Sequence, residues 1–221
     1  MPIAVADRST FIMKTYLHLL GAILLFTGIE AAIFSTDLAA RISSVFIGGR
    51  AWLLVLGAFV LVSWGATHIA NSAGSLGAQY LALGVFVVAE ALIFVPLLFI
   101  ANQFFPGVIQ SAALCTLVGF AGLTLVVYGT RKDFSFLRSI LMWGGIAAFV
   151  AIVAAVVFGF ELGVFFSVAM IALAGGAILY DTSNILHHYP EDRYVGAALA
   201  LFASVAMMFY YVLRLLMQLR R

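Results

Sequence analysis

The chain has 221 residues, of which 65% are hydrophobic and only 9% are charged, and its mean hydropathy is +1.19. About a quarter of the residues of a soluble domain are charged, so this composition excludes an ordinary soluble protein and indicates an integral membrane protein. The net charge of +2 is spread thinly and leaves no basic patch for nucleic acid, and the single cysteine, Cys115, excludes a disulfide framework.

A transmembrane helix needs about 20 mostly apolar residues. Seven runs meet this condition: 14–36, 51–71, 77–100, 107–129, 136–159, 162–186 and 194–217. We interpret the first run as a span, because it is too long for a signal-peptide core and lacks a cleavage site of small residues. The short breaks leave no room for a soluble domain, so the sequence predicts one all-α membrane domain over residues 1–221, with residues 1–13 as a short N-terminal tail.

Basic residues outside the spans predict the orientation of the chain. With seven spans, the N-terminal side carries Arg8, Lys14, Arg131, Lys132, Arg138 and Arg193, and the opposite side carries Arg41, Arg50, Arg214, Arg220 and Arg221. When the C-terminal arginines are set aside, the positive-inside rule favours a cytoplasmic N-terminus. The C-terminal arginines themselves run against this orientation.

Asp181 is the residue of the sixth span that most needs an explanation. It follows an apolar stretch, 139–180, in which the only charged residue is Glu161. A carboxylate beside so much hydrocarbon is costly unless it is protonated, paired or facing water, and is a functional-site hypothesis by default. Ala174 and Ala177 share its helical face, and small residues let membrane helices approach closely. Asp181 is therefore expected on an interior face.

Two further polar residues of the spans have two interpretations each. Glu90 is the only charge between residues 51 and 130. It is either a protonated packing residue with a hydrogen bond inside the bundle or a cation or proton site in a pore. His68 is expected at the same end of the bundle as Asp181. It either forms a proton-sensitive pair with Asp181 or is a solitary residue near the membrane surface.

The remaining polar residues favour no catalytic or metal site. Adjacent His187 and His188 point to different sides of a helix or turn, whereas zinc needs converging ligands, so a solvated loop is expected there. Ser72 and Ser75 lie near His68 in the sequence but form no protease motif. A nucleotide-binding motif is also lacking, so we expect neither an enzyme nor a cofactor.

The lysines exclude a retinal protein, which is another class of seven-helix membrane protein, and Glu30 is expected to be a packing residue. A retinal protein needs a lysine deep in its last helix, but the only lysines are Lys14 and Lys132. Glu30 lies late in the first span, close to a membrane surface, and is expected to be structural.

Two segments resemble the Bax inhibitor family of membrane proteins. They are Arg-Lys-Asp-Phe-Ser-Phe-Leu at 131–137 and Gly-Ala-Ile-Leu-Tyr-Asp-Thr-Ser-Asn-Ile at 176–185, separated by two spans and followed by one more. The resemblance covers the whole hydropathy pattern and is specific in its motifs over residues 131–214. It implies seven helices with the seventh at the centre. Family members are described as pH-sensitive calcium leak channels and suppressors of cell death, and a bacterial branch restrains a membrane-anchored AAA protease.

The resemblance also implies roles for single residues, and this chain differs from the channel-type members at two of them. Channel-type members carry two aspartates, on the sixth and seventh helices, that share a proton, and an arginine on the second helix that can bind them. Asp181 matches the first aspartate, but Ser204 stands at the second position, and a serine cannot share a proton as a second carboxylate does. The arginine is missing too, and His68 is the nearest basic candidate.

This departure brings the chain closer to the protease-modulating bacterial branch. The implied function is that of an inner-membrane partner of a membrane-anchored AAA protease, with residues 1–10 of the N-terminal tail as its exposed handle. The alternative is a pH-sensitive calcium leak channel gated through Asp181. In either case the expected site residues are Asp181, Ser204, Glu90 and His68, with lipid as the surrounding solvent.

Overall fold

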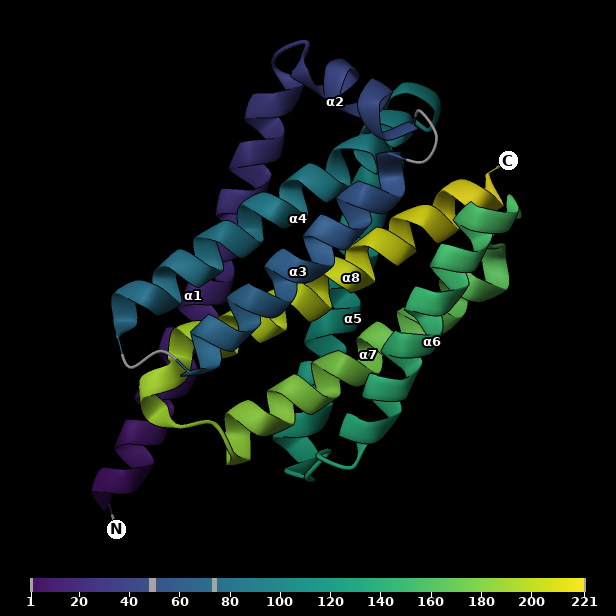
Figure 1. Cartoon of the computed structure of the whole chain (residues 1–221). Helices are drawn as coiled ribbons and strands as arrows, with labels where there is room; N and C mark the ends of the chain where they lie inside the picture. Colours follow the sequence, from purple (N-terminus) through teal and green to yellow (C-terminus); the bar gives the residue numbers. More distant parts are fainter. Residues whose placement is uncertain (1, 48–50, 73–74, 221) are drawn as a thin grey trace.

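The fold is a bundle of helices, seen in a computed structural model that describes residues 2–47, 51–72 and 75–220 (Figure 1). Side chains are described for residues 8–46, 53–72 and 75–220. No strand occurs among these residues. The elements are α1 (Pro2–Phe34), α2 (Leu38–Ile47), α3 (Ala51–Ser72), α4 (Leu76–Phe104), α5 (Val108–Thr130), α6 (Leu137–Phe158), α7 (Val164–His187), the 3₁₀ turn η1 (Glu191–Arg193) and α8 (Tyr194–Leu219).

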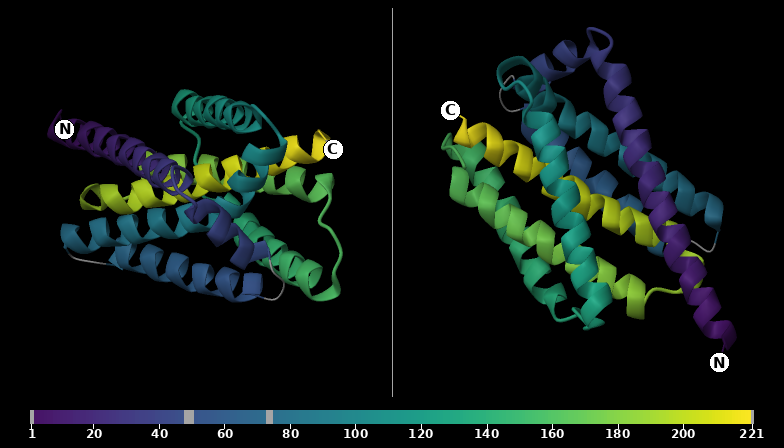
Figure 2. Two further views of the ribbon diagram at one scale, coloured as in Figure 1. Left: turned by 90° about the horizontal axis from the view of Figure 1, so that it is seen from above. Right: turned by 180° about the vertical axis from the view of Figure 1, so that it is seen from behind.

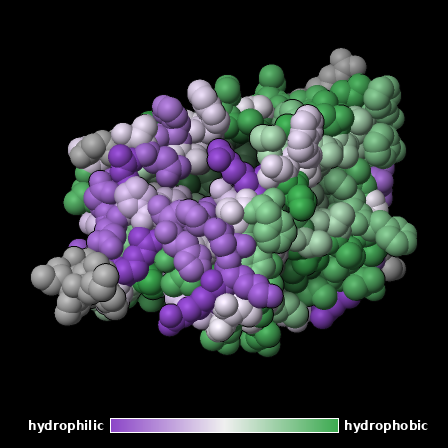
Figure 3. Space-filling view, turned by 90° about the horizontal axis from the view of Figure 1, so that it is seen from below, coloured by the Kyte–Doolittle hydropathy of each residue, from purple (hydrophilic) through white to green (hydrophobic). Residues whose placement is uncertain are grey.

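Seven of the described helices are long and apolar enough to cross a membrane, which confirms the predicted all-α membrane fold. The sixth predicted span is α7 and the seventh is α8. The chain ends lie at opposite ends of the bundle (Figure 1), which we call the N-terminal end and the C-terminal end. Seen from below, hydrophilic residues gather on one part of the surface and hydrophobic residues cover much of the rest (Figure 3). Such an apolar surface suits contact with lipid.

Two segments differ from the sequence-based expectation. The tail expected over residues 1–13 is helical from Pro2 onward and continues into the first span, because proline is favoured in the first turn of a helix and no breaker follows it. The break between the first two spans contains α2, which is too short to cross a membrane. Its Ala39 is buried whereas Val45 is exposed, so α2 is a short helix with one packed face.

Helix α8 lies at the centre of the bundle, as the family resemblance implied. Its apolar window is 67% buried, compared with 11–50% for the other six spans. It packs against α1, α3, α4, α5 and α7. The view from above shows α8 running between α1 and α5 on one side and α3 and α4 on the other (Figure 2). A shift of α8 would therefore alter its packing against five other helices of the bundle.

Gly196 makes the close approach of α8 to α3 possible. A Cβ atom at this position would lie 2.9 Å from the carbonyl oxygen of Ala70, which is backbone and cannot turn aside. Gly196→Ala is therefore expected to lower the free energy of unfolding by about 1–3 kcal/mol, the usual cost of overpacking. Thermal unfolding in detergent measures this loss. Gly122→Ala is the matched control, because a Cβ there meets no atom within 4 Å; equal melting temperatures for both variants would contradict the packing argument.

Candidate functional site

The structure brings Asp181 of α7 and Ser204 of α8 together in the core. The Oγ of Ser204 donates a hydrogen bond to Oδ2 of Asp181 at 2.6 Å, and both side chains are buried. Ile178 and Ile185, each fully buried, lie one turn to either side of Asp181 on α7. A hydroxyl donor lowers the cost of a carboxylate in such surroundings but adds no charge. The expected contact is present, and the part it plays in function stays a prediction.

The two sequence segments that carry the family resemblance meet next to this pair. The backbone amide of Phe134 donates to Oγ of Ser183 at 2.9 Å, and this hydroxyl lies 3.5 Å from the carbonyl oxygen of Lys132, to which it donates. The loop between α5 and α6 is thereby fixed to α7 only two residues beyond Asp181. The two motifs, which two spans separate in the sequence, are therefore in direct contact in the structure.

The loop also forms an ion pair with the end of α7. Nε2 of His188 lies 3.4 Å from Oδ2 of Asp133, and both side chains are about half exposed. The backbone amide of Ser135 donates to Asp133 at 2.8 Å and lowers the pKa of its carboxyl, and His188 and His187 act in the same direction. Within the described residues no group of three or more His, Cys, Asp or Glu side chains could hold a metal ion. His188 thus serves as a partner of Asp133.

Arg8 of α1 ties the N-terminal helix to the end of α7. Its guanidinium donates to the carbonyl oxygens of Ile185 and Tyr189, each at 2.5 Å, and more weakly to that of Asn184 at 3.5 Å. A cation at a helix C-terminus also interacts favourably with the helix dipole. The guanidinium lies 4.8 Å from the ring centre of Phe11. Sequence reasoning counted Arg8 only as an orientation signal, because its partners lie more than 170 residues away.

Aromatic hydroxyls form a polar layer beside the Asp181 site. Burial raises the pKa of Tyr189, and the charge of Asp181 acts in the same direction, so the two groups lie close enough to interact. The hydroxyl of Tyr16 on α1 interacts with those of Tyr128 on α5 and Thr182 on α7. None of these three reaches a hydrogen bond of normal geometry. Polar groups from three helices therefore meet at Thr182, the residue that follows Asp181.

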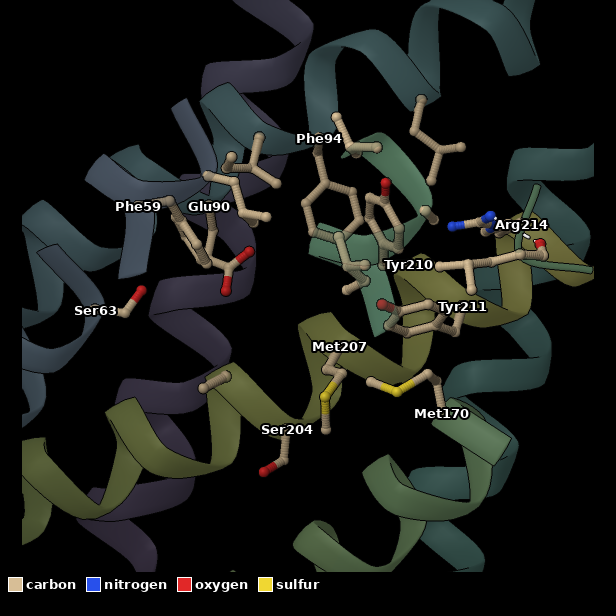
Figure 4. Close-up of a pocket in the computed structure, with 18 of the residues that line it drawn as sticks. Phe59, Ser63, Glu90, Phe94, Met170, Ser204, Met207, Tyr210, Tyr211 and Arg214 are labelled. Carbon is tan, nitrogen blue, oxygen red and sulfur yellow. Dashed lines mark hydrogen bonds between the residues drawn. The ribbon is translucent and has the colours of Figure 1, made fainter. Parts of the chain in front are cut away.

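Glu90 faces a cavity of about 920 Å³ on the other side of Ser204. The cavity is lined by α3 and α4 on one side, by α6 and α7 on the other and by α8, and both Glu90 and Ser204 contribute to its wall. The Glu90 carboxyl points into the open space, while the Ser204 hydroxyl points away from it (Figure 4). Glu90 and Ser204 thus line the same cavity, and no described contact joins Glu90 to the Asp181–Ser204 pair.

His68 does not belong to this group of residues. Its side chain is exposed on α3 and stacks on Trp64 at a ring-centre distance of 5.9 Å, and no described contact joins it to Asp181. Of the two interpretations of His68, the structure matches the solitary residue and not the pair with Asp181, because the side chain of His68 is exposed and faces away from the core. Ser72 donates to the backbone carbonyl of His68, and Ser75 accepts the amide of Ala78 at the start of α4. Neither hydroxyl is placed as a nucleophile beside the imidazole.

The sequence is similar to a family model and to several known proteins. A family model described as "Inhibitor of apoptosis-promoting Bax1" matches residues 8–221. The "Modulator of FtsH protease YccA" of Escherichia coli is 34% identical over 110 residues, which cover 49% of this chain and 50% of that protein. "Protein LIFEGUARD 3" of Arabidopsis thaliana is 30% identical over 151 residues, which cover 65% of this chain and 58% of that protein. The chain thus spans about half the length of the curated relatives it matches.

Proposed function

The chain belongs to the Bax inhibitor family, and from this premise we propose that it modulates a membrane-anchored AAA protease in the inner membrane of a bacterium. One observation carries the proposal: the partner of Asp181 is the hydroxyl of Ser204. The similarity to a protein named as a modulator of FtsH protease supports the same choice of function.

The chemistry of the pair explains why a hydroxyl favours this function over gating. Two carboxylates that share a site repel each other once both ionise, so their protonation state can move helices apart. A hydroxyl carries no charge and can donate to the carboxylate or accept from the carboxylic acid. The contact between α7 and α8 is therefore kept in both protonation states of Asp181. A bundle that stays closed suits a protein that acts through its surface.

Co-purification tests the proposed partnership. The protein is expected to co-purify with a membrane-anchored AAA protease in mild detergent. Removal of residues 2–7 is expected to slow degradation of the protein itself without preventing binding. This segment makes up most of the proposed handle, and Arg8, which holds α1 to α7, remains in place. Absence of the protease from the purified material would count against the proposal.

A second function, a pH-sensitive calcium leak through Asp181, has an observation of its own in its favour. The cavity that Glu90 faces is bounded by Ser204, directly beside Asp181. A water-filled cavity with an acidic side chain could receive a cation. Calcium release from proteoliposomes across roughly pH 5 to 8 tests it, since perturbed carboxyl groups titrate in this window. Leak that depends on pH and is lost in Asp181→Asn would support the channel, whereas equal leak from both proteins would exclude a role for Asp181.

A further inference from the structure

The cavity beside α8 has a buried acid, Glu90, in its wall. Glu90 is 8% exposed, and no hydrogen bond or ion pair joins its carboxyl to another described residue. Its oxygen atoms border the cavity itself, as the direction of the side chain in Figure 4 shows. A carboxyl group in such surroundings is costly unless a donor or a cation meets it. The volume of about 920 Å³ falls in the range of small-molecule sites, roughly 300–1,000 Å³.

The walls around Glu90 are rich in aromatic rings. The aromatic residues of the lining are Phe59, Trp64, Phe86, Phe94, Phe160, Tyr210 and Tyr211. The rings of Phe94 and Tyr210 meet edge to face at 5.3 Å, and those of Phe59 and Phe86 are tilted at 6.4 Å. The faces of aromatic rings carry negative potential and attract organic cations within about 6 Å. An acid among such rings favours a ligand that is both apolar and positively charged.

The positive charge of the cavity lies apart from Glu90 and is already engaged. Arg214, toward the C-terminal end of α8, donates to the carbonyl oxygen of Leu162 at 3.0 Å, and Gln218 donates to the same oxygen at 3.1 Å. Glu161, in the same loop, is exposed. Arg214 and Gln218 are thus engaged with the loop at this end of the cavity. Glu90 and Glu161 are the acids among the described lining residues, and of the two only Glu90 is buried.

Access to the cavity is available at the level of the membrane. Helix α3 packs against α4 and α8, whereas α6 packs against α7, and the two groups stand on opposite sides of α8 (Figure 1). Trp64 of α3 lines the cavity and is 70% exposed, so it lies on the rim. A compound dissolved in the bilayer could enter between the two groups of helices.

We propose that this cavity binds a lipophilic organic cation, whose charge pairs with the carboxylate of Glu90 and whose apolar groups pack against the surrounding aromatic rings. The site differs from the Asp181–Ser204 pair and requires neither protease modulation nor calcium flux. Quaternary ammonium and phosphonium compounds have the matching chemistry.

Equilibrium binding of radiolabelled tetraphenylphosphonium to the purified full-length protein in detergent tests the proposal. Saturable binding of about one cation per chain is expected. Glu90→Gln keeps the shape of the side chain and removes its charge, so it is expected to weaken binding at least about tenfold, since loss of one partner of a buried charge pair typically costs that much or more. Glu90→Asp keeps the charge and is expected to retain part of the affinity.

Two controls separate charge recognition from simple partition into an apolar cleft. Glu30→Gln removes another buried acid, on α1, which does not line the cavity, and it is expected to leave the affinity unchanged. Tetraphenylborate has the same shape as the probe and the opposite charge, and it should show no saturable binding when it is tested alone, in place of the cation. Absence of saturable binding of the cation, equal affinity of the parent and Glu90→Gln, or equal binding of tetraphenylborate would each overturn the proposal. The comparison of the two ions needs no variant and is therefore independent of any folding defect.

Discussion

Ser204→Asp is expected to make both the stability and the permeability of the protein depend on pH. The new carboxylate would replace a hydroxyl that lies 2.6 Å from Asp181. Two ionised carboxylates at this separation repel each other, and one of them must hold a proton for the helices to stay in contact. We expect the variant to be less stable than the parent by about 3–5 kcal/mol near pH 8, the usual cost of an unpaired buried charge, and by much less near pH 5.

Thermal unfolding at a series of pH values, together with calcium release from proteoliposomes, measures this effect. Ser204→Asn is the matched control, because it has the size of aspartate without the charge, and its stability should change with pH only as that of the parent does. Calcium release that depends on pH in Ser204→Asp, but not in the parent or in Ser204→Asn, would support the proposal that Asp181 paired with a hydroxyl does not gate the protein. The assignment is wrong if the aspartate variant behaves like the asparagine variant at every pH.

Arg8→Ala is expected to release the C-terminal turn of α7. The guanidinium donates to two carbonyl oxygens at 2.5 Å, and hydrogen bonds to charged groups contribute about 1.5–3 kcal/mol each. Because the site is only partly buried, solvent screens the charge, and we expect a total loss of about 2–4 kcal/mol. Amide hydrogen exchange should increase at residues 184–189, and the melting temperature should fall.

Two variants make the Arg8 experiment specific. Arg8→Lys keeps the positive charge but lacks the planar fork, so it should recover only part of the stability. Arg138→Ala removes an exposed arginine at the start of α6 and should change neither measurement. Unchanged exchange at residues 184–189 in Arg8→Ala would show that other contacts hold the end of α7.

The sequence was sufficient to predict the membrane spans, because hydropathy over about 20 residues is a local property. It was insufficient for α2, whose ten residues are too few to cross a membrane, and for the helical state of the expected N-terminal tail. The central place of α8 came from the family resemblance. In the structure, this place corresponds to a helix that is buried on most of its circumference.

The site was predictable only where residues are related by helical spacing or motif. Asp181 and Ser204 were expected to face each other, and the structure joins them by a hydrogen bond. His68 shares the end of the bundle with Asp181 but points outward, and the rotation of α3 about its axis is not visible in its almost uniformly apolar sequence. Arg8 was missed because its partners are backbone carbonyl groups, which no side-chain pattern reveals.

Glu90 illustrates a further limit of sequence reasoning. The alternatives were a hydrogen-bonded packing residue and a site within a pore. The structure shows a buried carboxyl that borders a cavity and has no hydrogen-bond partner among the described residues, which matches neither alternative fully. Whether bulky neighbours fill a space or surround it depends on how α3 and α6 stand on either side of α8. That arrangement arises from contacts between helices distant in the sequence.

The central claim is that this protein modulates a membrane-anchored AAA protease. The most direct measurement is the rate at which the purified protease degrades a membrane substrate in proteoliposomes, with and without an equimolar amount of this protein. We expect slower degradation in its presence, and the same slowing with Asp181→Asn, because an amide can still bond to Ser204 and keep α7 and α8 together. An unchanged degradation rate, combined with calcium release that depends on pH and on Asp181, would contradict the account and favour the channel.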